Sequence, residues 1–210
     1  LLAWAGQEKS ADAASLPRLQ QQGVGSALRF ATAFPKDPRT GPVLANAADR
    51  LFALNEPARA TAVAQQVLAM DPPASGPQRR VAWTVIAHAA FDRGAFDEAE
   101  RAYAQVLPLM PERDTARGDI VERQAASIYK QGEKARAAGQ AREAVAHFAR
   151  VGSVAPASRV HAAAQVDAAA SLIGLKDWAA AARTLEDFRQ QNPSHPLAAE
   201  VPAKLAVVYT

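Results

Sequence analysis

The 210-residue sequence contains no cysteine and few aromatic residues. Without cysteine, this sequence offers no disulfide, no thiolate nucleophile and no thiolate ligand for zinc. Aromatic residues make up 6% of the chain although 49% of it is hydrophobic, because alanine supplies much of the apolar content. Alanine has the highest helix propensity and lets helices approach closely. The composition therefore favours an all-α fold.

Long apolar runs and strand-like patterns are also missing. No apolar run approaches the roughly 20 residues that a membrane-spanning helix needs, so we expect no direct membrane insertion by this chain. No β-branched residues alternate with polar ones, as they would in a half-buried strand. The sequence has no initiator methionine and no signal peptide, and it ends at Thr210 inside a helical pattern. We therefore expect it to be a piece of a longer polypeptide.

Charge of one sign is not in clear excess either. The 24 basic and 21 acidic residues leave a net charge of +3 and are mixed along the chain. So small an excess is a weak signal for nucleic-acid binding. The basic residues between Lys130 and Arg150 spread around their helices without an aromatic platform on which bases could stack. We expect no nucleic-acid partner.

Motifs for catalysis, metals and phosphates are absent as well. None of the histidines has a close ligand spacing such as HExxH; they are His88, His147, His161 and His195. Asp97 and Glu98 open a helix, where negative charge offsets the helix dipole. Gly23-Val24-Gly25 lacks the preceding strand and the third glycine of a phosphate loop. We therefore predict a protein that is not an enzyme and has no cofactor and no metal.

The clearest pattern that is present lies in residues 81–111. Its first half places apolar residues at the i, i+3, i+4, i+7 spacing of one helix face: Trp83, Ile86, Ala87 and Ala90. Gly94 interrupts the pattern, and a second apolar face follows at Ala99, Tyr103, Val106 and Leu107 before Pro111. The segment is predicted to form two helices joined by a turn.

This arrangement recurs along the chain. A small residue in each second helix precedes a closing proline by the same interval, in the pairs Ala60/Pro72, Ala99/Pro111, Ala144/Pro156 and Ala181/Pro193. The turn position is held by Asn55, Gly94, Gly139 and Lys176. We predict an irregular N-terminal part over residues 1–40, with a helix over 16–34 that could break near Gly23, and a repeat array over 41–210. Its units are about 42–72, 80–111, 117–156 and 158–193, with a truncated unit at 197–210.

The order of large and small residues in these hairpins resembles the tetratricopeptide repeat (TPR). The resemblance implies an all-α fold, an α-solenoid of stacked antiparallel helical hairpins in a right-handed superhelix, because one hairpin cannot bury its own apolar face. In this family the first helices line a concave groove that holds a protein or peptide partner. The matching groove positions here are Asn46, Asp49, Thr84, His88, Phe91, Tyr129, Lys130, Glu133, Arg136 and Asp167.

Two segments narrow the resemblance. Residues 28–38 and 188–200 share an aromatic residue, a short polar run and the pattern Pro-x-x-Pro. They are similar to the TPRs of bacterial cell-envelope proteins such as the barrel-assembly lipoprotein and the coordinator of the Tol-Pal system. This implies a scaffold in the periplasm or at the outer membrane. The alternatives are a cytoplasmic adaptor or regulator, or an accessory part of a larger enzyme or nucleic-acid-binding protein.

Overall fold

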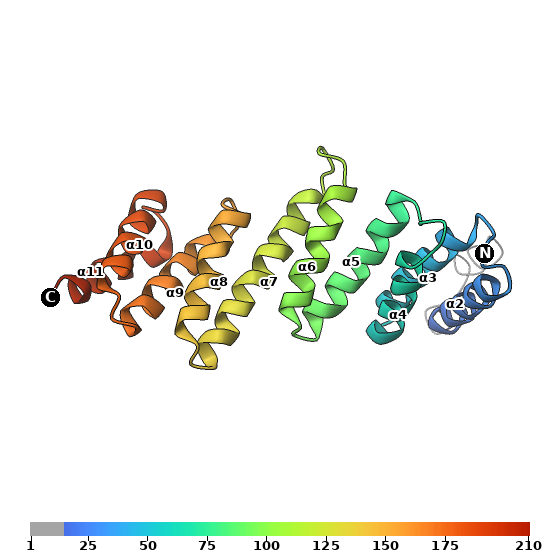
Figure 1. Ribbon diagram of the computed structural model, residues 1–210, viewed down its shortest axis with the longest axis horizontal. Coiled ribbons are helices and arrows are strands. Elements are labelled where there is room, and N and C mark those ends of the chain that lie inside the picture. The colour runs from blue at the N-terminus through green and yellow to red at the C-terminus, as the bar shows by residue number, and fades with distance from the viewer. Residues whose placement is uncertain (1–14) are drawn as a thin grey trace. The chain divides into compact units, whose positions relative to one another are not determined.

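The computed structural model describes residues 15–210, which form α-helices joined by short connectors and contain no strand (Figure 1). Expectations for residues 1–14 lie outside the described residues. The α-helices are α2 (Leu16–Ala33), α3 (Thr40–Ala53), α4 (Pro57–Leu68), α5 (Gly76–Asp92), α6 (Phe96–Val106), α7 (Arg117–Ala137), α8 (Ala141–Val154), α9 (His161–Gly174), α10 (Trp178–Gln191) and α11 (Val201–Tyr209). Short 3-10 helices follow α6 and precede α11, at Leu107–Leu109 and Pro196–Glu200.

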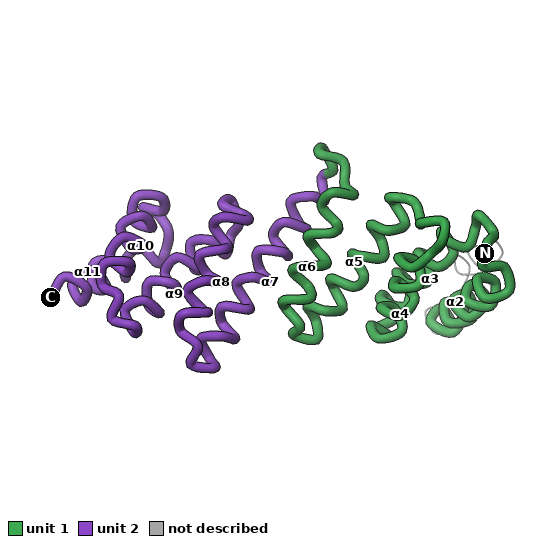
Figure 2. Tube along the Cα trace, in the orientation of Figure 1, with its two compact units in different colours: residues 1–114 green, residues 115–210 purple. Residues whose placement is uncertain are grey.

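The helices group into two compact units, residues 1–114 and residues 115–210 (Figure 2). In unit 1, the hairpin α5/α6 stacks on the hairpin α3/α4, and α2 packs on α3. In unit 2, the hairpin α9/α10 stacks on the hairpin α7/α8, and α11 packs on α10. Each unit is thus a stack of antiparallel helical hairpins, and the predicted all-α solenoid is confirmed. The repeat boundaries given above stay a prediction.

All four hairpins turn through a residue with positive φ. These residues are Asn55, Gly94, Gly139 and Lys176, with φ between 60° and 76°. At each turn two backbone N–H groups close the end of the first helix, as Glu56 N–H does to the Leu51 carbonyl and Asn55 N–H to the Phe52 carbonyl, both at 2.9 Å. This is the Schellman arrangement, in which a left-handed residue lets the last carbonyls of a helix find donors. The turn positions read from the sequence are therefore the points where the chain reverses.

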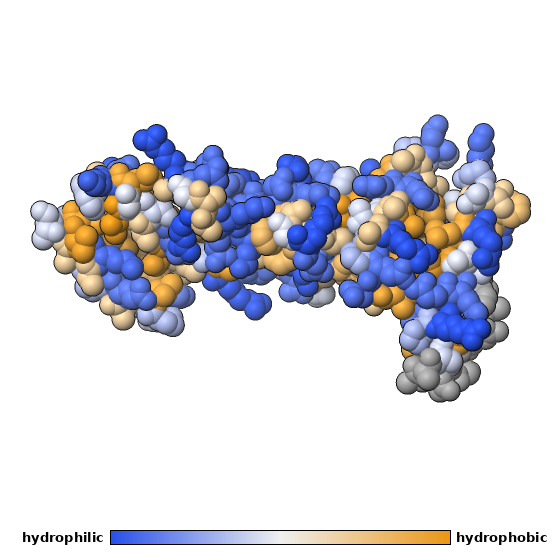
Figure 3. Space-filling model, turned by 90° about the horizontal axis from the view of Figure 1, so that it is seen from below, coloured by the Kyte–Doolittle hydropathy of each residue, from blue (hydrophilic) through white to orange (hydrophobic). Residues whose placement is uncertain are grey.

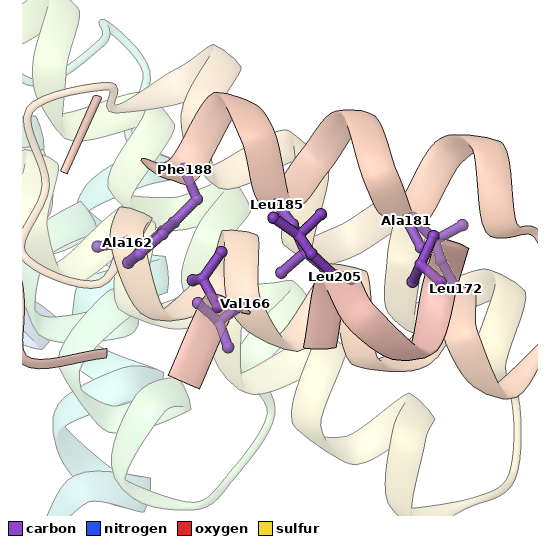
Figure 4. Close-up of a cluster of buried hydrophobic side chains, with 10 residues drawn as sticks. Ala162, Val166, Leu172, Ala181, Leu185, Phe188 and Leu205 are labelled. Atoms are coloured by element: carbon purple, nitrogen blue, oxygen red, sulfur yellow. The ribbon is translucent and has the colours of Figure 1, made fainter. Parts of the chain in front are cut away.

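The small residue of each second helix lies where the two helices of a hairpin cross. Ala60, Ala99, Ala144 and Ala181 all have no solvent exposure. In unit 2, for example, Ala181 of α10 lies beside Leu172 of α9 in a cluster that also holds Leu185, Phe188 and Leu205 (Figure 4). A larger side chain at these alanines would need space that the core does not have.

The helices α7 and α8 approach each other closely at Gly132. Gly132 of α7 lies so near the ring of Phe148 that an added Cβ would be 2.5 Å from Cε1. Phe148 is almost fully buried, with 1% of its surface exposed. In the other hairpins the place of Gly132, seven residues before the turn, is taken by Ala48, Ala87 and Ala169. The glycine therefore makes room for the largest side chain at this crossing.

The helix predicted over residues 16–34 has no break. It runs as α2 through Gly23 and Gly25, and Gly23, Val24 and Ala27 are buried. A glycine inside a helix costs about 1 kcal/mol relative to alanine. The burial of this face against α3 offsets that cost, so the helix continues where the sequence pattern alone suggested an interruption.

Three connectors, between α2 and α3, between α8 and α9, and between α10 and α11, form the same turn with different residues. Asp37, Ser158 and His195 each donate their backbone N–H to the carbonyl three residues earlier, at 3.0–3.1 Å. Each side chain then accepts a backbone N–H two residues later, which Asp37 takes from Arg39 at 2.8 Å, Ser158 from Val160 at 3.3 Å and His195 from Leu197 at 3.2 Å. A short polar side chain that bonds the backbone in this way favours a turn over a continued helix.

The end of unit 2 carries exposed apolar residues. Figure 3 shows apolar side chains gathered at the end that holds α10 and α11. On α11, Val207 is 55% and Tyr209 68% exposed, while Val201, Leu205 and Val208 face the core.

Candidate functional site

Five of the predicted groove residues lie together in unit 2, on the first helices α7 and α9. Tyr129, Glu133 and Arg136 share one face of α7, since they are spaced i, i+4, i+7. Asp167 lies on the neighbouring helix α9 and accepts hydrogen bonds from two of these residues. The Tyr129 hydroxyl donates to Asp167 Oδ2 at 2.5 Å, and Arg136 Nη1 donates to Asp167 Oδ1 at 2.5 Å. We call Tyr129, Lys130, Glu133, Arg136 and Asp167 the α7/α9 cluster.

The remaining contacts of this cluster hold its long side chains in place. Lys130 Nζ forms an ion pair with Glu133 Oε2 at 2.6 Å. The guanidinium carbon of Arg136 lies 5.5 Å from the centre of the Phe148 ring, a cation–π geometry. The Tyr129 ring packs against the same phenylalanine, with the ring centres 5.4 Å apart. Phe148 therefore anchors both residues that bond to Asp167.

The shifted ionisation of the cluster follows from these contacts. Burial, together with the hydrogen bond to Asp167, raises the pKa of Tyr129 well above its ordinary value. The hydrogen bond to Asp167 raises the pKa of Arg136. The hydroxyl therefore stays protonated and the guanidinium charged at neutral pH, as both hydrogen bonds require. The arrangement is a polar surface whose side chains are held in a fixed geometry.

The five predicted residues of unit 1 are arranged differently. Asn46 and Asp49 are exposed on α3. On α5, the Thr84 hydroxyl donates to the Arg80 carbonyl of its own helix at 2.8 Å. The Phe91 ring meets Phe96 edge-on at 5.3 Å between ring centres. Among residues 15–210, no hydrogen bond or ion pair joins the side chain of Asn46 or Asp49 to α5, so the structure does not bring these five together as it does the cluster in unit 2.

His88 lies in a row of three rings. Its ring centre is 5.7 Å from that of Phe52 on α3 and 5.7 Å from that of Tyr103 on α6. The sequence analysis did not single out Phe52. The signal for it was available, because Phe52 precedes Asn55 by the same three residues as Phe91 precedes Gly94 and Arg136 precedes Gly139. A side chain three residues before the turn residue lies on the same face of the first helix as the predicted groove residues Phe91 and Arg136.

A second set of contacts holds the connectors in place. We did not predict these contacts from the sequence. Glu122 of α7 accepts from the Ser158 hydroxyl at 2.9 Å and from the Arg159 backbone N–H at 3.1 Å. In unit 1, Arg80 of α5 forms an ion pair with Asp114 at 2.7 Å. In both units, an early residue of a first helix thus holds the connector that follows the second helix of its own hairpin.

No group of three or more histidine or acidic residues among residues 15–210 could hold a metal ion. Within the same residues, no helix is both long enough and apolar enough to span a bilayer.

The comparison with known families matches part of unit 2. Residues 121–202 match the family model YfiO, described as an outer membrane lipoprotein. This part of the chain is similar to those lipoproteins. The matched segment covers less than half of the chain and contains the whole α7/α9 cluster. The resemblance to bacterial envelope TPR proteins inferred from the sequence is confirmed. No curated relative matches the chain.

Two solved structures are similar over most of the chain. The first, the crystal structure of YrrB, is titled a TPR protein with an unusual peptide-binding site; it is 18% identical, and the match covers 83% of this chain and 97% of that one with a TM-score of 0.36. The second is the APC/C hetero-tetramer Cut9–Hcn1, which is 17% identical, with coverage of 91% and 40% and a TM-score of 0.35. Both scores are low, so the fold assignment depends on the hairpin geometry itself.

Proposed function

We propose that the chain is a non-enzymatic scaffold that binds a protein or peptide partner in a bacterial envelope assembly through the faces of its first helices. The observation that carries this proposal is the α7/α9 cluster. Its residues are fixed by contacts between two neighbouring first helices, and they lie within the segment that is similar to outer membrane lipoproteins.

Arg136 is the residue best suited to contact a partner. Its side chain is 42% exposed, while Asp167 and the Phe148 ring restrain it. A guanidinium has five N–H donors, so the bond to Asp167 leaves donors for an incoming carboxylate or carbonyl. Because the side chain is already ordered, little rotamer entropy is lost when a partner binds. Arginine is also among the residues that contribute most to protein interfaces.

Unit 1 offers a candidate partner surface of its own, with other chemistry. Asn46 and Asp49 offer exposed polar groups on α3, and His88 and Phe91 offer half-buried rings on α5. We propose that these residues and Thr84 contact a partner as well. A surface that combines amides, a carboxylate and aromatic rings fits a folded or helical protein segment better than a small metabolite.

The experiment compares two arginine variants of the full chain. The immobilised protein is incubated with an envelope extract, and the bound proteins are quantified. We expect Arg136→Ala to lose the specific partner. The matched control Arg142→Ala, which removes an exposed arginine from the second helix α8, should retain it. A third variant with Asp49, His88 and Tyr129 all changed to alanine probes both units. If all three variants retain the same partners, the first-helix faces are not the binding surface.

The compartment is tested separately. Fractionation of cells that produce the full-length protein should recover it with the periplasm or the outer membrane. Recovery in the cytosol would instead support the alternative of a cytoplasmic TPR adaptor.

A further inference from the structure

A pocket lies in unit 1 outside the proposed partner surface. It has a volume of about 600 Å³ and is lined by residues of α4, α5 and α6, and by none of α3. On α5 the pocket is lined by Trp83 and Ile86. These point about 140° away from the mean direction of Thr84, His88 and Phe91, given 100° per residue in a helix. The pocket therefore lies on the other side of α5.

The floor of the pocket is apolar. It is formed by Trp83 and Ile86 of α5 together with Leu68 of α4. Trp83 and Leu68 are half-buried, so part of their apolar surface still faces solvent. Covering this surface with an aliphatic side chain would remove further apolar area from water, which is favourable.

The charged residues at the rim are already neutralised. Glu98 pairs with Arg93, and Arg101 pairs with Asp97 at 2.9 Å. Neither Arg93 nor Asp97 lines the pocket. A charged occupant would thus lose hydration without gaining an unpaired counter-charge. The pocket favours a neutral occupant.

The polar groups that remain match a peptide backbone. The side-chain amides of Gln65 on α4 and Gln105 on α6 form no hydrogen bond within residues 15–210, and neither does the Trp83 indole N–H in that part of the chain. Each amide offers donors and an acceptor, and the indole offers one donor. An extended peptide needs both kinds of partner for its C=O and N–H groups.

We propose that this pocket, which we call the Trp83 pocket, binds an uncharged extended peptide segment that inserts one aliphatic side chain against Trp83. Gln65 and Gln105 bind the main chain on either side of that side chain. The site is separate from the first-helix surface, so the scaffold can hold two segments at once.

The test uses the fluorescence of Trp83. The full chain carries Trp4→Phe and Trp178→Phe, so that Trp83 is its only tryptophan. The probe is an acetylated and amidated pentapeptide of serine, glycine, leucine, glycine and serine. We expect a saturable blue shift of the emission with a Kd on the order of 0.1–1 mM, as for a ligand of this size. The same peptide with glutamate in place of leucine should give no saturation over that range.

Three variants decide whether the pocket is responsible. Gln65→Ala with Gln105→Ala should weaken binding by about tenfold, since two main-chain hydrogen bonds are lost. Ala104→Arg, which fills the pocket from α6, should abolish the shift. The control Gln66→Ala removes an exposed amide of α4 that does not line the pocket, and should leave the Kd within twofold.

Asp167→Asn, in the α7/α9 cluster of unit 2, should not change the peptide affinity at all. The proposal is overturned if the leucine peptide gives no saturable shift, if the glutamate peptide binds equally well, or if Gln66→Ala weakens binding as much as the double variant does.

Discussion

The helices α5 and α7 share a register and differ in the chemistry of one face. Counted back from their left-handed turn residues, Thr84, His88 and Phe91 occupy the places of Tyr129, Glu133 and Arg136. On α5 this face packs rings against rings. On α7 it forms a hydrogen bond and two ion pairs, in addition to the packing of Tyr129 on Phe148. The hairpin register is the same in both, so it depends on the crossing residues and the turn, while the outward face is free to vary.

The largest expected effect tests the crossing itself. Gly132→Ala should lower the free energy of unfolding by about 2–3 kcal/mol, because the new Cβ would overlap the buried ring of Phe148. The equivalent residue of α5 is already an alanine, the fully buried Ala87, so the effect is specific to α7. Denaturant unfolding measures it.

A double-variant cycle provides the control for this prediction. Phe148→Leu should offset part of the loss caused by Gly132→Ala, because the smaller side chain leaves room for the Cβ. Simple additivity of the two changes would show that the close approach is not the cause.

The next effect concerns the turns. Lys176→Gly should raise the free energy of unfolding by about 1 kcal/mol, because a residue with a side chain is strained at φ 60° and glycine is not. Asn55→Gly should raise it by less, since asparagine tolerates the left-handed region. Thermal melts of the two variants show which substitution stabilises the protein more. An equal gain at both turns would contradict the explanation.

The polar face of α7 should contribute less than the crossing. Tyr129→Phe removes one hydrogen bond to Asp167 and should cost about 1 kcal/mol at neutral pH. Burial raises the pKa of Tyr129 in the folded protein. The folded state therefore keeps a proton that the unfolded state loses above about pH 10, so stability falls as the pH rises beyond that value. Unfolding measured from pH 9 to pH 12 should show a shallower loss for Tyr129→Phe.

The smallest expected effect concerns the connector between α2 and α3. The hydrogen bonds from Arg39 lower the pKa of Asp37 to about 2. The stabilisation from this carboxylate is present above the unfolded pKa near 3.8 and is lost as the pH falls toward 2. Asp37→Asn should remove that part of the acid dependence. Its partner Arg39 is exposed, so the change will be small; an unaltered acid profile for Asp37→Asn would show that the turn does not depend on the charge.

Much of the fold could be predicted from the sequence because the hairpin register is local. Crossing alanines such as Ala99 and turn residues such as Gly94 are set by spacings within about 20 residues, and the structure places them as expected. The continuity of α2 could not be predicted in this way. It depends on burial against α3, which overrides the low helix propensity of Gly23 and Gly25.

The candidate site was less predictable for a related reason. The sequence marks Tyr129, Arg136 and Asp167 as members of one face, but their contact depends on how the hairpin α9/α10 stacks on α7/α8. The intervals between crossing alanines are irregular, so no fixed repeat length predicts which side chains meet. Whether the ten groove residues contact a partner stays a prediction.

The left-handed turn residues have a consequence for how this chain tolerates substitution. Asn55, Gly139 and Lys176 are exposed, and substitutions at exposed positions are usually tolerated. Valine, isoleucine and threonine, however, are strongly disfavoured at positive φ. A saturation library should therefore show three surface sites at which β-branched residues are rejected most strongly, and these sites would reveal where three of the four hairpins reverse without any coordinates.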